Sequence, residues 1–185
     1  MHGPGELGQA LRSSEGAPLG QVYAFLSSLY FRGKLTYATR FGAPLLPSPS
    51  TLVITPGHGL CRASTPVRVA ELTAISRVEV DADNPAFAEP LRRDAALLAS
   101  ALPAQVEVVL LGSIATSKYV DPLLSVFGER LLFPSDFVGR GDMSRGGMLL
   151  RAARAGHELS YTPVLTSPRS GRRATRLSEL RRHDP

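Results

Sequence analysis

The chain has 185 residues, of which 43% are hydrophobic, enough for one domain with a single core but with little room for a second. No run approaches the roughly 20 consecutive apolar residues that cross a bilayer, and the start lacks the basic-then-apolar order of a secretory signal, so we expect a cytoplasmic protein with no membrane association. The single cysteine, Cys61, excludes an intramolecular disulfide, and no Cys-x-x-Cys or His-x-x-x-His spacing indicates zinc. No metal or other cofactor is predicted.

The net charge of +5 is concentrated near the C-terminal end. Residues 166–185 contain six arginines and two acidic residues, which gives +4, whereas residues 1–165 are almost neutral. This distribution is typical of a globular domain with an electrostatic anchor rather than of a dedicated DNA-binding fold. We expect residues 166–185 to form a disordered basic tail that can bind nucleic acid or an acidic partner. Residues 1–18 lack a sustained apolar period and are also expected to be disordered.

The apolar pattern of residues 19–165 predicts one domain in which helices alternate with short strands. Helical spacing of apolar residues predicts helices at 19–30, 35–41, 87–102, 117–127 and 142–155. Short apolar or β-branched runs predict strands at 51–55, 76–80, 106–111, 130–133 and 158–162. Gly128 and Gly156 are expected to end the last two helices. Because short connections join strands to helices, we expect a three-layer α/β fold with a mostly parallel sheet of about four or five strands flanked by helices.

The first candidate site residue, His58, follows the predicted strand 51–55. In open parallel sheets, ligands bind beyond the carboxyl ends of the strands, and His58 has this position. Glycines on both sides let the backbone turn sharply and leave the imidazole accessible, as a general base or a phosphate contact requires. The alternative is a histidine that only forms hydrogen bonds within its own turn, and the sequence favours neither reading.

A second candidate segment, residues 112–119, follows the predicted strand 106–111. Its sequence, GSIATSKY, places hydroxyl side chains and a lysine at the start of a helix, where free backbone N–H groups attract anions. Ser113, Thr116 and Lys118 are therefore candidate ligand-binding residues. The spacing is not that of a phosphate-binding P-loop. For each single hydroxyl, capping of the helix is the alternative role.

A third candidate segment, residues 134–147, contains four glycines, two arginines and two aspartates around a predicted helix start. Arg140 and Arg145 are candidates for clamping a phosphate or carboxylate, and Asp142 for acid–base catalysis. The alternative is a glycine-rich turn in which Asp142 caps the helix and Arg145 lies on a solvated face.

Residues 30–34 alternate aromatic and basic side chains. Such a segment could stack on a base and hold a phosphate. The reading favoured by the sequence is that Tyr30 and Phe31 are core residues with neighbouring cations that extend to solvent.

The order of these segments is similar to that of known proteins. The runs 29–34, 57–60, 109–119 and 139–147 resemble, over residues 29–164, a group of uncharacterised bacterial conserved proteins. They are more remotely similar to the peroxide-stress-resistance (YaaA-type) family, which implies DNA binding. Those proteins open with a strand before the region of Leu29, and residues 1–19 do not have the pattern of one. We therefore expect the sheet to lack that strand, or the strand to precede the printed start.

Three functions remain open on the sequence. The leading hypothesis is a nucleic-acid- or nucleotide-binding protein whose candidate residues share one cleft; the residues are His58, Ser113, Lys118, Arg140 and Arg145. The second is an enzyme that acts on a nucleotide or nucleobase, with His58 or Asp142 transferring protons. The third is a non-catalytic partner-binding protein. An approach of His58 to Asp136 or Asp142 would favour the enzyme.

Overall fold

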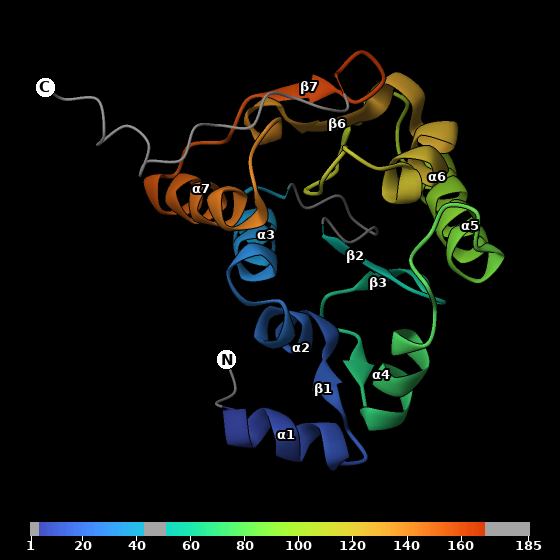
Figure 1. Ribbon diagram of the computed structural model, residues 1–185, viewed down its shortest axis with the longest axis vertical. Helices are drawn as coiled ribbons and strands as arrows, with labels where there is room; N and C mark the ends of the chain where they lie inside the picture. Colours follow the sequence, from blue (N-terminus) through green and yellow to red (C-terminus); the bar gives the residue numbers. More distant parts are fainter. Residues whose placement is uncertain (1–3, 43–50, 169–185) are drawn as a thin grey trace, which may run out of the picture.

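The structure is a computed structural model, and it describes residues 4–42 and 51–168 (Figure 1). Its helices are α1 Pro4–Arg12, α2 Leu19–Leu26, α3 Ser28–Phe41, α4 Val69–Ser76, α5 Pro85–Ala101, α6 Ser117–Phe127 and α7 Asp142–Ala155, with short 3₁₀ turns η1 Gly128–Arg130 and η2 Ser135–Phe137. Its strands are β1 Ala17–Pro18, β2 Leu52–Thr55, β3 Gly59–Arg62, β4 Pro66–Val67, β5 Val108–Val109, β6 Leu131–Pro134 and β7 Tyr161–Pro163. None of the described helices is long and apolar enough to cross a membrane.

The predicted parallel sheet of four or five strands was wrong. The described strands instead form three small sheets: the antiparallel pair β1–β4, the antiparallel hairpin β2–β3, and the three-stranded sheet β5–β6–β7. Helices form most of the fold around them (Figure 1). The strands are too short and too scattered to build a central layer, so the protein does not have the three-layer architecture that the alternation of elements indicated.

The hairpin β2–β3 explains much of this difference. Pro56 and Gly57, the latter with φ 76°, form a tight turn that is closed by a hydrogen bond from the His58 N–H to the Thr55 carbonyl, 2.9 Å long. Proline followed by a residue of positive φ is typical of a type II turn, which reverses the chain. β2 therefore pairs with the residues that immediately follow it, with Thr55 opposite Gly59, instead of feeding a crossover helix.

The unit β5–α6–β6 was predicted correctly. Val108 and Val109 pair in parallel with Leu131 and Leu132, and α6 joins the two strands. β6 is buried throughout, whereas β5 is shorter than the apolar run from which it was predicted. The third strand, β7, adds to β6 in the antiparallel direction.

The structure differs from the sequence predictions in three other segments. Pro4–Arg12, predicted to be disordered, form α1, whose Leu7 is buried. The segment predicted as the strand 76–80 contains the end of α4 and an irregular turn. The predicted helices 19–30 and 35–41 are instead divided as α2 and α3, and Gly33, between the two predictions, lies inside α3. Residues 169–185, most of the predicted basic tail, lie outside the described residues.

The described hydrophobic side chains pack in two clusters. The larger lies between α3, α5, α6, α7 and β6 and contains Phe87, Phe133, Phe137 and Leu149. The smaller joins α1, β1, α2, β4 and α4 and includes Leu19. Within the larger cluster, α3 and α7 lie side by side, as do α5 and α6 (Figure 1). The contact between α3 and α7 positions the side chains described next.

Candidate ligand-binding cavity

A cavity of about 1160 Å³ lies between α3, the hairpin β2–β3, the end of α5, the segment that contains β5, and the starts of α6 and α7. Most of its wall is apolar, with contributions from Phe41, Ile54, Leu98 and Val108 among others. Its volume is somewhat above the roughly 300–1,000 Å³ of small-molecule sites, and an apolar wall with a few polar groups is the usual make-up of such a site.

One face of α3 forms a wall of this cavity. Tyr30, Lys34, Tyr37 and Phe41 are spaced by four, three and four residues, so they lie on the same side of the helix, and all four line the cavity. At 1.5 Å per residue, this face extends for roughly 16 Å. It carries a cationic group near one end and a tyrosine hydroxyl further along.

Lys34 is the most unusual group on this wall. Its Nζ lies 4.1 Å from the centroid of the Tyr30 ring, a cation–π contact, and no described carboxylate forms an ion pair with it. Burial lowers the pKa of Lys34 to about 8; the charge of Asp142 opposes this shift and that of Arg145 adds to it. The ammonium is therefore partly desolvated, and Asp142 compensates its charge without forming an ion pair with it.

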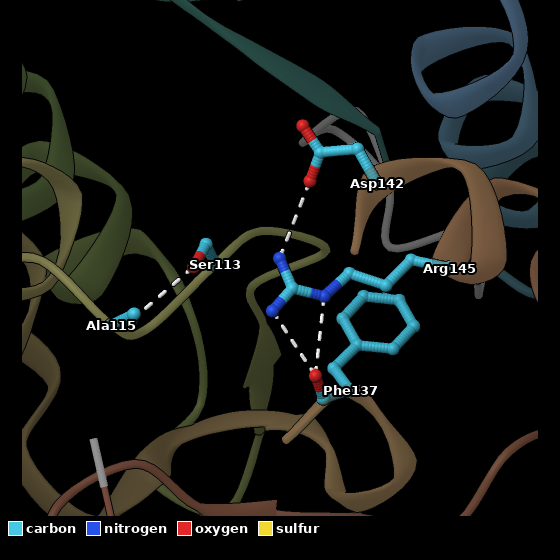
Figure 2. A network of polar contacts seen from close by, with 5 residues as sticks. All are labelled: Ser113, Ala115, Phe137, Asp142 and Arg145. Atoms are coloured by element: carbon cyan, nitrogen blue, oxygen red, sulfur yellow. Dashed lines mark hydrogen bonds and ion pairs between the residues drawn. The ribbon is translucent and has the colours of Figure 1, made fainter. Parts of the chain in front are cut away.

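Arg145 lies beside Lys34, but its guanidinium already has hydrogen-bond and ion-pair partners within the protein. Only 8% of Arg145 is exposed, and its Nε and Nη2 donate to the Phe137 carbonyl at 3.2 and 3.1 Å. Its Nη1 lies 3.4 Å from Oδ1 of Asp142, the first residue of α7 (Figure 2). The guanidinium also lies over the Phe137 ring. Arg145 thus ties α7 to the turn before it, and its charge acts on the cavity at close range.

The Tyr30 hydroxyl is buried and has no hydrogen-bond partner. Burial raises the pKa of Tyr30 to about 12, although the nearby Arg145 cation opposes the shift. A buried hydroxyl without a partner costs stability, and the Arg145 guanidinium is the charged group that acts most strongly on it.

The loop after β5 contributes Ser113, and the start of α6 contributes Lys118, to the cavity wall. The Ser113 hydroxyl accepts a hydrogen bond from the Ala115 N–H at 3.3 Å (Figure 2), and Thr116, the N-cap of α6, makes no side-chain capping bond. Lys118 Nζ lies 5.2 Å from the centroid of the Tyr119 ring. Burial, followed by the charge of Asp142, raises the pKa of Tyr119.

The lysines of this chain are confined to the cavity wall. Among the 21 lysines and arginines of the sequence, only Lys34 and Lys118 are lysines, and both line this one cavity. The sequence uses arginine at every other basic position. This rarity was visible in the sequence, but only the structure shows that residues 84 positions apart share one site.

A chain of hydroxyl groups occupies a different part of the cavity wall. The Leu159 N–H donates to the Tyr37 hydroxyl at 2.8 Å, the hydroxyls of Tyr37 and Tyr161 are 2.5 Å apart, and the Tyr161 hydroxyl donates to Glu158 at 3.3 Å. Burial and the Tyr37 hydroxyl raise the pKa of Tyr161. This chain joins α3 to β7 and gives the cavity a hydrogen-bonding region separate from the lysines.

The structure brings together some of the predicted site residues. Ser113, Lys118 and Asp142 line the cavity, and Arg145 contacts Asp142. Four of the predicted residues are not among the described residues that line it: Arg145, His58, Thr116 and Arg140.

His58 lies elsewhere because β2 ends in a hairpin turn, where this residue is exposed. Arg140 is also exposed, and its Nε donates to the Asp136 carbonyl at 2.8 Å within its own turn. Sequence reasoning missed Lys34, because the aromatic residues beside it were interpreted as core.

Comparison of the chain with protein-family models, with curated proteins and with solved structures finds no match in any of the three. The resemblance to the peroxide-stress-resistance family stays an interpretation of the sequence, and the cavity itself supports the functional conclusion.

Proposed function

We propose that the protein binds a small anionic ligand of the nucleotide class in the cavity between α3 and α6. The observation that carries this proposal is that the two lysines of the chain both line this cavity, and that the ammonium of Lys34 has no carboxylate partner among the described residues. A partly buried cation without an ion-pair partner is costly, and a bound anion lowers that cost.

The remaining wall supports a ligand with an apolar or aromatic body. The cavity is large enough for a nucleotide, its wall is mostly apolar, and the chain of Tyr37, Tyr161 and Glu158 offers hydrogen bonds away from the lysines. A phosphate near the lysines, a base against the apolar wall and sugar hydroxyls near this chain would use all three features.

The second sequence hypothesis, acid–base catalysis by His58 with Asp142, receives less support. Asp142 lines the cavity, whereas His58 lies in the exposed turn of the hairpin. We therefore favour ligand binding over acid–base catalysis as the function of this cavity.

A thermal-shift titration tests the proposal. Nucleoside monophosphates are compared with the matching nucleosides, with orthophosphate and with short oligonucleotides. A ligand that binds only the folded state stabilises it by about 2.7 kcal/mol at a hundredfold excess over Kd, which is readily measured as an increase in Tm. We expect the monophosphates to raise Tm more than the nucleosides or orthophosphate do.

The variants Lys34→Met and Lys118→Met should lose most of this increase. Arg32→Met is the matched control, because Arg32 is an exposed cation on the same helix and is not among the described residues that line the cavity. Stabilisation by oligonucleotides alone would assign the protein to nucleic acid. If no probe raises Tm, or if Arg32→Met loses the effect as fully as Lys34→Met, the proposal is overturned.

A further inference from the structure

One part of the cavity wall ends in a carboxylate whose direction is fixed by a chain of hydrogen bonds. Glu158, which precedes β7, lines the cavity, and its Oε1 accepts a hydrogen bond from the Tyr161 hydroxyl at 3.3 Å. The Tyr161 hydroxyl lies 2.5 Å from that of Tyr37, and both tyrosines also line the cavity. The Tyr37 hydroxyl accepts a hydrogen bond from the Leu159 N–H at 2.8 Å. The chain therefore begins at the backbone and ends at Glu158.

The last member of this chain determines the direction of its protons. A carboxylate oxygen only accepts, so the single hydroxyl proton of Tyr161 is used on Glu158. The proton between the two tyrosines must then come from Tyr37. Neither hydroxyl has a proton left for a ligand, whereas Oε2 of Glu158 has no hydrogen-bond partner among the described residues. Through these side chains the wall can accept hydrogen bonds from a ligand but cannot donate them.

Glu158 differs in this respect from the other two described carboxylates that line the cavity. Asp142 is paired with Arg145, whose Nη1 lies 3.4 Å from its Oδ1. Glu107 is exposed and forms no ion pair with a described residue. Glu158 also has no ion-pair partner among the described residues, but the hydrogen bond from Tyr161 fixes its direction. It is therefore the carboxylate of this wall that is best placed to recognise a neutral hydrogen-bond donor.

We propose that Glu158 determines the sugar specificity of the cavity, by accepting hydrogen bonds from the neighbouring 2′- and 3′-hydroxyls of a ribose. This assignment rests on the proposed nucleotide site and names the sugar of its ligand. Two neighbouring hydroxyls match the two oxygens of one carboxylate. An acidic side chain binds the ribose 2′-hydroxyl in the same way in dinucleotide-binding folds.

The charges of the wall determine how the ligand is oriented. The carboxylate of Glu158 repels a phosphate, whereas Lys34 and Lys118 attract one. Lys34 and Tyr37 are three residues apart on α3, a rise of about 4.5 Å along one face of the helix. The cation on α3 and the hydroxyl chain are thus about one helical turn apart, a separation that one nucleoside 5′-monophosphate can span.

The test compares ribonucleoside 5′-monophosphates with their 2′-deoxy counterparts on the full-length protein, and the matching nucleosides form a second pair. The apparent Kd of each compound is obtained from the increase of Tm with its concentration. The members of each pair share every group except the 2′-hydroxyl, so the ratio of their Kd values reports on that hydroxyl alone. We expect the ribonucleotide to bind at least about tenfold more tightly, as a hydrogen bond to a charged group allows.

Glu158→Gln is the test variant, because it keeps the size of the side chain, removes the charge and replaces one acceptor oxygen by a donor. This variant should lose most of the preference for the ribonucleotide. Glu107→Gln is the matched control, because it removes the charge of another exposed glutamate at the same cavity, and it should keep the preference. Since Glu158 is itself exposed, the variant should fold, and its Tm without ligand checks this.

The outcomes separate this assignment from the proposed function. Equal binding of ribonucleotides and deoxyribonucleotides overturns the ribose site and leaves nucleotide binding intact. A preference that Glu158→Gln retains, or that Glu107→Gln loses as fully, also overturns the assignment to Glu158. A preference for ribonucleosides with no gain from the phosphate supports the ribose site and contradicts the anion site. If none of these compounds raises Tm, both proposals are overturned.

Discussion

Gly33 and Gly146 bring α3 and α7 so close together that a Cβ atom on Gly33 would lie 2.8 Å from the carbonyl oxygen of Gly146. The reverse substitution is equally tight, because a Cβ on Gly146 would lie 2.9 Å from the Cα of Tyr30. Both clashes involve backbone atoms, which cannot rotate away. This crossing sets the positions of Lys34 on α3 and Asp142 on α7, and so shapes the cavity.

We expect Gly33→Ala and Gly146→Ala each to lower the free energy of unfolding by about 1–3 kcal/mol, because the helices must move apart. Gly147→Ala is the control: it lies next in the same helix and its Cβ would meet only the flexible end of Arg151, at 3.4 Å. That variant should be neutral or slightly stabilising, since alanine favours helices more than glycine does. Denaturant unfolding measures all three, and equal effects at positions 146 and 147 would contradict the prediction.

Lys34 should make the folded protein more stable as the pH rises from about 8 towards 10. In the folded state its pKa is lowered by burial from 10.5 to about 8. Below pH 8 both states bind the proton, and the folded state bears the cost of the buried charge. Between the two values the unfolded state binds more protons, so stability increases with pH.

The measurement is the difference in unfolding free energy between Lys34→Met and Arg32→Met at several pH values from 7 to 9.5. Lys34→Met should be the more stable at pH 7, and the difference should shrink as the pH rises. The raised pKa of Tyr30 lowers the stability of the folded state as the pH rises. This effect begins only above pH 10, where the tyrosine ionises in the unfolded state. A difference that does not change with pH would show that Lys34 is fully solvated.

Arg130 should be replaceable by an apolar residue without loss of stability. Its Nε and Nη2 are buried and have no hydrogen-bond partner. Because two buried donor nitrogens without acceptors are destabilising, Arg130→Met should leave the melting temperature unchanged or raise it. A loss of more than about 2 kcal/mol would show that the guanidinium has a partner in solution.

Asp94 should anchor the β2–β3 hairpin to α5. Its Oδ2 accepts a hydrogen bond from the Leu60 N–H at 2.9 Å, and its Oδ1 pairs with Arg93. Asp94→Ala leaves the amide of Leu60 without this partner and should cost about 1–3 kcal/mol. Arg93→Ala removes only a surface ion pair and should cost less than about 1 kcal/mol. Similar losses in the two variants, measured by denaturant unfolding, would assign the effect to the ion pair instead.

Local patterns in the sequence were sufficient to predict the unit β5–α6–β6 and the helix α7. In α6, apolar residues at helical spacing and Gly128, which has a positive φ of 54°, define the helix and its end without help from distant residues. Gly156, with φ 72°, ends α7 in the same way. Such signals are readable because they depend on neighbours within one or two turns.

The direction of strand pairing and the set of residues in the site could be determined only from the tertiary structure. The apolar run of β2 is compatible with a parallel or an antiparallel partner, and the turn at Gly57 brings β3 against it before any helix can intervene. Lys34 and Lys118 lie on separate helices, and their presence at one cavity depends on how α3, α6 and α7 pack. Sequence periodicity indicates which face of a helix is buried, but the partner of that face is selected by packing between distant segments, which local residues do not encode.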